Sequence, residues 1–236
     1  MTGVGRNPQE YPTVSIENGI DGSRAIKLET KSTGQFGETV KMPIAAGNLF
    51  LGSFDVNNAV QKPLKATRFG LPFGKKPLQL KGYYKYTPGT QPFKAKDKNG
   101  NTVTIPGQED EGDIYAVLYE AAELDGKALD GNNVLTSKNI VALARVEVEK
   151  KDEFTAFHVD FHYGSRIPID WPKFIQDQRD PSDDGTGEYL PFKEEKMKNY
   201  EYNLAVVFTS SKYGAYFAGS VGSTLCIDKV EIVCEK

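Results

Sequence analysis

Residues 210–235 read SSKYGAYFAGSVGSTLCIDKVEIVCE, a glycine-rich segment that leads into the last predicted strand of the chain. The residues of that strand, 224–234, have high β-propensity, but their alternation changes phase part-way. Ile227 lies on one face of a regular strand and Ile232 on the opposite face. One extra residue at 228–229 would return both to a single apolar face, so we predict a β-bulge there.

Three aromatic residues, Tyr213, Tyr216 and Phe217, stand among the glycines of this segment. Glycine permits backbone conformations that other residues rarely adopt, so the segment is predicted to be a shaped loop rather than a strand. Its aromatic residues either pack down on the sandwich or form a platform on which a sugar ring stacks. Both interpretations are open at this point.

The composition excludes several classes of protein. The chain has 236 residues and a formal net charge of −3, and no stripe of basic residues indicates a nucleic-acid partner. No apolar run is long enough to span a membrane, and the first twelve residues lack the apolar segment of a signal peptide. Cys226 and Cys234 lie eight residues apart on one predicted strand, roughly 26 Å, so they cannot form a disulfide with each other. We expect both to be small buried side chains.

Short alternating segments bounded by Gly, Pro, Asn and Asp follow one another along the chain and predict about ten strands. The fold class is therefore all-β, and the expected architecture is a jelly-roll β-sandwich. Residues 1–12 are expected to be a flexible tail, and residues 13–236 a single domain. Residues 164–199 lack strand periodicity and predict a long loop, with one short helix near Pro172.

An acidic cluster at Glu109, Asp110, Glu111 and Asp113 precedes the predicted strand at 114–120. A glycoside hydrolase or lyase would need two carboxylates on either side of a cleft. The cluster could supply them only if alternate residues on one strand face pointed the same way. The alternative interpretation is a solvated turn, which the intervening Gly112 favours.

The segment FTAFHVDFHY, residues 154–163, places His158, Asp160 and His162 on one strand face, with neighbouring side chains ~6.7 Å apart. This face is either solvated or forms the floor of a shallow sugar groove. A metal site is the least favourable interpretation, because the two histidines are ~13 Å apart along the strand.

Aromatic residues also mark the long loop: Trp171, Phe174, Tyr189 and Phe192. A ring that lies flat against solvent can stack on the apolar face of a sugar. The single Trp of the chain lies in this loop, so Trp171 is the best candidate for such a platform, with Phe174, Tyr189 and Tyr216 as further ligand-binding candidates. Alternatively, these rings anchor the loop to the sandwich.

Four segments, AAGNLFLGSFDV, FGLPFGKKPLQLKGYYKYTPG, DIYAVLYEA and SSKYGAYFAGSVGSTLCIDKVEI, occur in this order and resemble the "putative carbohydrate metabolism domain" family of gut-dwelling Gram-negative bacteria. The resemblance extends over roughly residues 20–234. It implies a jelly roll similar to galactose-binding domains and carbohydrate-binding modules, and a location in the periplasm or at the outer-membrane cell surface. The family supplies no catalytic residues to carry over.

Modules of this kind often hold a structural Ca²⁺ ion where the first strand meets the last. The matching oxygen ligands here would come from Asp21, Ser23 and Asp228. In the other interpretation Asp228 accepts hydrogen bonds from the amides of a turn. Together these observations predict a non-catalytic carbohydrate-binding module that captures glycan at the cell surface. A hydrolase or lyase using the acidic cluster, and a protein-binding adhesion or assembly module, are the alternatives.

Overall fold

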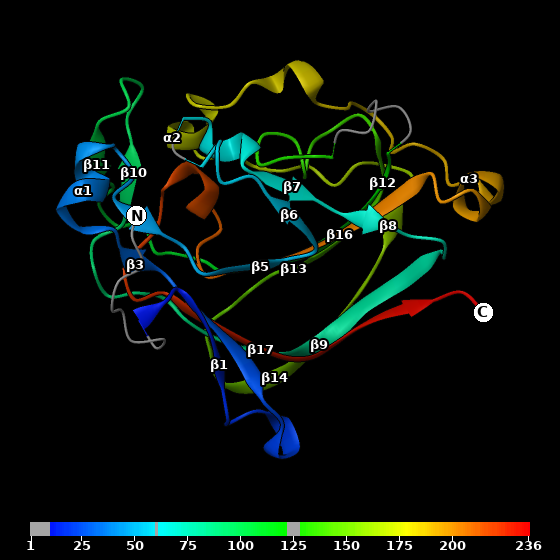
Figure 1. Cartoon of the computed structure of the whole chain (residues 1–236), viewed down its shortest axis with the longest axis horizontal. Coiled ribbons are helices and arrows are strands. Elements are labelled where there is room, and N and C mark those ends of the chain that lie inside the picture. The colour runs from blue at the N-terminus through cyan, green and yellow to red at the C-terminus, as the bar shows by residue number, and fades with distance from the viewer. Residues whose placement is uncertain (1–9, 60, 122–127) are drawn as a thin grey trace.

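The computed structural model describes residues 10–59, 61–121 and 128–236, which fold as an antiparallel β-sandwich of the jelly-roll type (Figure 1). This confirms the predicted all-β fold. The five-stranded sheet has the order β1 (Thr13–Ile16), β2 (Ala25–Glu29), β17 (Thr224–Cys234), β9 (Pro77–Thr87), β14 (Lys151–Asp160). The six-stranded sheet has the order β15 (His162–Tyr163), β13 (Ile140–Val146), β12 (Asp113–Glu120), β16 (Tyr202–Thr209), β5 (Asn48–Phe50), and β8 (Leu71–Pro72) also pairs with β16.

The two sheets enclose the main hydrophobic core. On β9, alternate residues Leu80, Tyr84 and Tyr86 point into this core and are buried. Ile114 and Leu118 of β12 meet them from the opposite sheet. The period-2 pattern of the sequence therefore corresponds to the burial that is observed.

The bulge in β17 is confirmed. Asp228 pairs with Tyr83 and Glu231 with Lys81, so three steps on β17 match two on β9. Lys229 takes up the extra residue with a φ of 47°. As a result Ile227 and Ile232 both face the main core.

A third layer lies over the outer face of the six-stranded sheet, at the top of Figure 1. It contains β6 (Gly52–Phe54), η3 (Pro63–Lys65), β7 (Thr67–Phe69), and parts of the predicted long loop with α2 (Lys173–Gln176) and η5 (Pro181–Asp183). A second hydrophobic core forms between this layer and the sheet, and Tyr119 is buried in it, with its hydroxyl donating to the Phe69 carbonyl at 2.5 Å. All eight residues of β12 are buried because both of its faces are covered.

The remaining elements are short. A hairpin of β10 (Lys94–Lys96) and β11 (Thr102–Thr104) and a pair of β3 (Lys31–Ser32) and β4 (Ile44–Ala45) flank one end of the sandwich. The helical segments are η2 (Ile20–Gly22), α1 (Gly34–Thr39), α3 (Glu194–Lys198) and η6 (Gly214–Tyr216), besides those of the third layer. The predicted helix near Pro172 is confirmed as α2. Over the described ranges, no helix combines the length and apolar character that a bilayer span requires.

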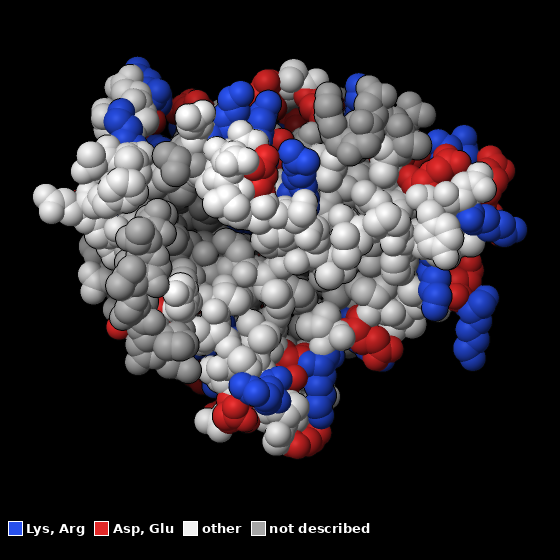
Figure 2. All heavy atoms as spheres, viewed as in Figure 1, with Lys and Arg blue, Asp and Glu red and all other residues white. Residues whose placement is uncertain are grey.

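Apolar side chains are exposed at one edge of the six-stranded sheet. Leu49 of β5 pairs with Phe208, and Leu71 of β8 pairs with Leu204. Phe208 and Leu204 belong to the main core, whereas Leu49 and Leu71 are exposed. Figure 2 shows that charged side chains keep mainly to the rim of this view. The two cysteines are free; Cys226 is buried as predicted, whereas Cys234 is half-buried.

Candidate functional site

A cavity of about 350 Å³ lies between the outer face of the six-stranded sheet and the third layer, and we name it the outer-face cavity. Its volume is within the range of small-molecule sites. Its roof and walls include residues from Phe54 to Ala59, from Pro63 to Phe69, from Gly131 to Thr136, Trp171, and from Gly214 to Phe217. The lining is therefore assembled from residues far apart in sequence.

Strand register builds the floor of the cavity. Tyr115 on β12 pairs with Arg145 on β13 and with Val207 on β16, and Val207 pairs with Phe50 on β5. The next row joins Asp113 to Thr209 and Thr209 to Asn48. Residues two apart on a strand share a face, so both rows point into the same cavity.

An ion pair lies in this floor. The Asp113 carboxylate accepts two hydrogen bonds from Arg145, from Nε at 3.0 Å and from Nη2 at 2.7 Å. The two side chains are 4% and 17% exposed, respectively. Burial acts to lower the pKa of Arg145, but the neighbouring carboxylate of Asp113 outweighs it and raises that pKa. Because the pair is bidentate, it holds the guanidinium in one orientation at the cavity floor.

Aromatic rings form one wall of the outer-face cavity. Trp171 lies edge-on to Tyr216 with ring centroids 6.4 Å apart, and Tyr213 lies at the same centroid distance on another side. Phe174 packs against Tyr213 behind this wall. Burial raises the pKa of Tyr213 to about 12. The predicted candidates Trp171, Phe174 and Tyr216 are thus brought together, and of the three, Trp171 and Tyr216 line the cavity.

A second depression of about 370 Å³ adjoins the first, and Trp171, Leu135 and Thr136 line both. We name it the arginine groove, because Arg166 and Arg179 line it from two parts of the long loop. The Arg179 guanidinium lies 4.5 Å from the Trp171 ring centroid, close enough for a cation–π contact. Trp171 therefore stands between an apolar cavity and a basic groove.

Asp110 lies in a separate buried cluster that the solvated-turn interpretation did not predict. Its carboxylate accepts from the hydroxyls of Ser211 at 2.6 Å and Ser223 at 2.7 Å, and from the backbone N–H groups of Ser220 at 2.8 Å and Glu111 at 3.0 Å. The solvated-turn interpretation is wrong for Asp110 and Asp113, which are buried, and agrees with Glu109 and Glu111, which are exposed. The sheet and the closing loop bury the two aspartates because each has protein partners for its charge.

We expect Asp110→Asn to cost more stability at pH 4 than at pH 7. Burial, opposed by the hydrogen bonds from Ser211 and Ser220, raises the folded-state pKa of Asp110 from 3.8 to about 6. The folded chain therefore binds this proton more tightly than the unfolded chain, and the contribution to stability falls as the pH rises from about 4 to about 6. Asn has no such titrating proton. The difference in unfolding free energy between the two proteins should therefore shrink by on the order of 1–3 kcal/mol from pH 4 to pH 7.

Urea unfolding of both proteins at pH 4, 5, 6 and 7 measures this difference directly. A difference that stays constant over this range would contradict the raised pKa.

The predicted His158–Asp160–His162 face is not formed by one strand. His158 and Asp160 belong to β14 of the five-stranded sheet, where Gln79 donates to Asp160 at 2.8 Å. The chain crosses to the other sheet at Phe161, and His162 pairs with Leu143 on β13. The shared face was therefore a wrong prediction; all three side chains are exposed, and none lines either depression.

Two other aromatic candidates pack against the sandwich: Tyr189 is buried and Phe192 is half-buried. Tyr189 is buried in the second hydrophobic core, where its hydroxyl accepts from the backbone N–H of Ile167 at 3.2 Å. Phe192 stacks on Tyr202 at a centroid distance of 5.4 Å. Tyr189 therefore presents no open ring face, and the loop-anchor interpretation applies to it rather than the platform.

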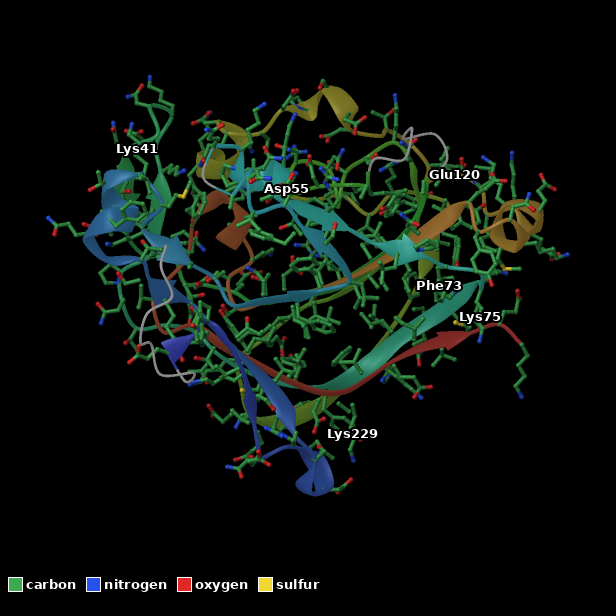
Figure 3. The ribbon with its side chains drawn as sticks, in the orientation of Figure 1. Lys41, Asp55, Phe73, Lys75, Glu120 and Lys229 are labelled. Atoms are coloured by element: carbon green, nitrogen blue, oxygen red, sulfur yellow. The ribbon has the colours of Figure 1, made fainter. Side chains whose placement is uncertain are left out.

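The residues proposed for Ca²⁺ lie on the far side of the molecule from the cavity, near Lys229 (Figure 3). Asp228 accepts hydrogen bonds from the Ser23 hydroxyl and from the N–H groups of Ile20 and Lys229, the two amides each at 2.7 Å. Burial acts to raise the pKa of Asp228, but these donors outweigh it and lower that pKa. Asp21 pairs with the Lys229 ammonium at 2.6 Å. These partners fit the turn-capping interpretation, because a Ca²⁺ ion would have to displace them; a calcium ion here stays a prediction.

Sequence reasoning missed Arg145, Arg166 and Arg179. Arg145 interrupts the apolar run of IVALARV, and a charged residue inside a strand covered on both faces indicates a buried partner. The two loop arginines had no comparable pattern around them, because irregular segments have no periodicity from which burial can be read.

A sequence model of the family described as "Putative carbohydrate metabolism domain" matches residues 1–233. No relative was found among curated proteins. A crystal structure named as a "putative glycoside hydrolase" from Bacteroides thetaiotaomicron is 43% identical with a TM-score of 0.80, and the match covers 99% of this chain and 60% of that chain. Another of the same description from Bacteroides vulgatus is 36% identical with a TM-score of 0.78, over 99% of this chain and 82% of that chain.

A family 11 carbohydrate-binding module from Clostridium thermocellum, solved with a β-1,3-1,4-mixed-linked tetrasaccharide, is 12% identical with a TM-score of 0.36. That match covers 94% of this chain and 81% of the module. This chain spans 60% of the length of the Bacteroides thetaiotaomicron protein. Because the family's sequence model covers the chain from residue 1 to 233, the chain belongs to the family described as "Putative carbohydrate metabolism domain".

Proposed function

We propose that this protein binds carbohydrate without catalysing its cleavage, and that the ligand enters the outer-face cavity beside Trp171. The observation that carries the proposal is the half-buried Trp171 ring, which lines both depressions and is fixed by rings on its edges. A rigid ring beside a cavity of this size suits a sugar, whose apolar face packs on the ring while its hydroxyls reach polar groups. Asn48, Thr209 and Arg145 are polar groups in the same lining.

The carboxylates argue against the hydrolase alternative that the relatives' names suggest. Among the described residues lining the two depressions, Asp113 and Asp184 are the carboxylates, and each pairs with an arginine. Glycoside hydrolysis needs one carboxyl group as a proton donor and a second as a nucleophile or base. Asp110, the buried member of the acidic cluster, is enclosed by hydrogen-bond donors instead. Binding without catalysis therefore fits these groups better.

The cellular role is part of the same proposal. A chain of this family that captures glycan would act in the periplasm or at the outer-membrane cell surface. A protein-binding adhesion or assembly module is the competing role, and it predicts no saccharide affinity at all.

Trp171→Ala should weaken saccharide binding about 10- to 100-fold, which corresponds to about 1.4–2.8 kcal/mol. The loss comes from the stacking surface. The melting temperature should fall by only a few degrees, because the ring is half-buried and its neighbours Phe93 and Ile175 keep their own contacts. Isothermal titration with a panel of soluble polysaccharides measures the affinity, and reducing-sugar release tests for cleavage.

Phe36→Ala is the matched control, since Phe36 is 59% exposed on α1 and lines neither depression. Its affinity should equal that of the unchanged protein. Reducing-sugar release by the unchanged protein would overturn the proposal in favour of the hydrolase. A large loss of melting temperature in Trp171→Ala would instead assign this ring to the core.

A further inference from the structure

Arg179 in the arginine groove carries a hydrogen-bond donor that the protein does not use. Its side chain is 8% exposed, and its Nη2 donates to both Asp184 oxygens at 2.8 Å and to the Thr136 hydroxyl at 3.2 Å. Its Nε is the one buried side-chain nitrogen or oxygen without a partner among the described residues. Buried donors are nearly always satisfied, so the unpartnered Nε marks Arg179 as a side chain whose hydrogen bonding the described chain leaves incomplete.

Arg166, which lines the same groove, has no carboxylate in direct contact with it, although Asp184 lies close enough to act on its charge. Its Nε, Nη1 and Nη2 donate to three backbone carbonyls, those of Glu188, Thr136 and Ser137, at 3.3, 3.2 and 2.9 Å. None of the ion pairs formed within the described ranges includes Arg166. A guanidinium has five N–H donors, so two remain after these three bonds. The carbonyls hold the group in place without cancelling its charge.

The side chains that line the two depressions carry a net positive charge, whereas the whole chain is net negative. Arg145, Lys212, Arg166 and Arg179 line the two depressions, against two carboxylates, Asp113 and Asp184. Their formal net charge is +2, or +1 when Glu111, the ion-pair partner of Lys212, is included, whereas that of the whole chain is −3. A local excess of one sign in a concave site attracts ligands of the other sign.

We propose that the arginine groove binds the carboxylate of a uronic acid residue, so that the glycan taken by this protein is an acidic one. The inference rests on the proposed function and adds the class of sugar. Guanidinium groups match planar carboxylates in geometry and donate charge-assisted hydrogen bonds to them. Because Trp171 lines both depressions, one uronate residue can place its ring on the indole and its carboxylate among the arginines.

The test compares polygalacturonate, alginate and glucuronoxylan, each with its carboxyl-reduced form, in titrations against the whole chain at low and high salt. Reduction turns the carboxylate into a neutral hydroxymethyl group and leaves the backbone of the polysaccharide unchanged. At least one acidic polysaccharide should bind 10-fold or more tightly than its reduced form, and added salt should reduce this preference. Arg166→Gln should remove most of the preference, so that the acidic and the carboxyl-reduced forms bind this variant with similar affinities.

Arg24→Gln is the matched control, because it removes one positive charge from an arginine that is 66% exposed and outside both depressions. Arg166→Lys keeps the positive charge but loses the planar guanidinium that can donate two parallel hydrogen bonds to a carboxylate. It should therefore retain only part of the preference that Arg166→Gln loses. If Arg166→Gln does not fold, as its melting curve would show, the comparison of acidic and reduced polysaccharides decides alone. Equal binding of both forms overturns the uronate inference and leaves the proposed function intact, whereas binding of neither form overturns both.

Discussion

Asp110→Ala is expected to destabilise the protein by about 3 kcal/mol or more. The Asp110 carboxylate accepts four hydrogen bonds, three of them from the closing loop through Ser211, Ser220 and Ser223. All three serines are buried, so water cannot replace the lost acceptor easily. In a chain of this size the melting temperature should fall by roughly 6–12 °C.

The closing loop is shaped around this carboxylate. A Cβ added at Gly219 would lie 2.9 Å from the Asp110 carboxylate and 2.5 Å from the Ser211 hydroxyl, so the loop can approach Asp110 only with glycine at this position. Loss of Asp110 should therefore loosen residues 211–223, and hydrogen exchange there should become faster.

Glu109→Ala is the matched control for this prediction. Glu109 is exposed and adjacent in sequence, and its removal should change stability by no more than about 0.5 kcal/mol. Thermal melts of both variants at pH 7 suffice. Equal melting temperatures for the two variants would show that Asp110 does not organise the loop.

The second large effect is expected for Asp113→Ala, which removes one half of the buried ion pair. The Arg145 guanidinium, 17% exposed, would lose both carboxylate oxygens of Asp113 and keep its charge in the cavity floor. Breaking a buried pair from one side costs about 3–5 kcal/mol, because the remaining charge is uncompensated. Urea unfolding should show this loss as a lower midpoint with an unchanged slope.

The double variant Asp113→Ala/Arg145→Met measures the interaction energy between the two side chains apart from what each contributes on its own. Removing both charges should recover much of the lost stability, so the two substitutions should be non-additive by about 2 kcal/mol or more. The rim pair of Glu111 and Lys212, whose carboxylate is 53% exposed, is the comparison, and Glu111→Ala should cost no more than about 1 kcal/mol. Additive effects at Asp113 and Arg145 would contradict the coupling that we infer from their geometry.

The strand pattern predicted the two sheets because alternate burial is visible in the sequence wherever one face of a strand is covered. The bulge at Asp228–Lys229 was predictable for the same reason, since the phase change of the apolar residues requires an extra residue. The crossing at Phe161 was not predictable. Both Phe161 and Tyr163 still face the main core after the chain changes sheet, so the alternation continues without a break.

The candidate site was predicted only in part. Trp171 was singled out as an unusual residue in a long loop, and the structure places it between two depressions. Tyr189 was an equally good candidate by sequence, yet its ring is buried beneath Arg166. Whether a loop aromatic faces solvent or core depends on how the loop folds back, and irregular segments carry no pattern that decides this.

The sequence alone determined the all-β class, the jelly-roll arrangement and the irregular strand at its end, because these follow from local propensity and from a period of two. Only the tertiary structure decided where charge is buried. Asp110, Asp113 and Arg166 acquire partners from segments far away in the chain, such as Ser211 for Asp110 and Ser137 for Arg166. A buried polar group is stable only with a partner, and such partners are set by the packing of the whole fold rather than by neighbours in sequence.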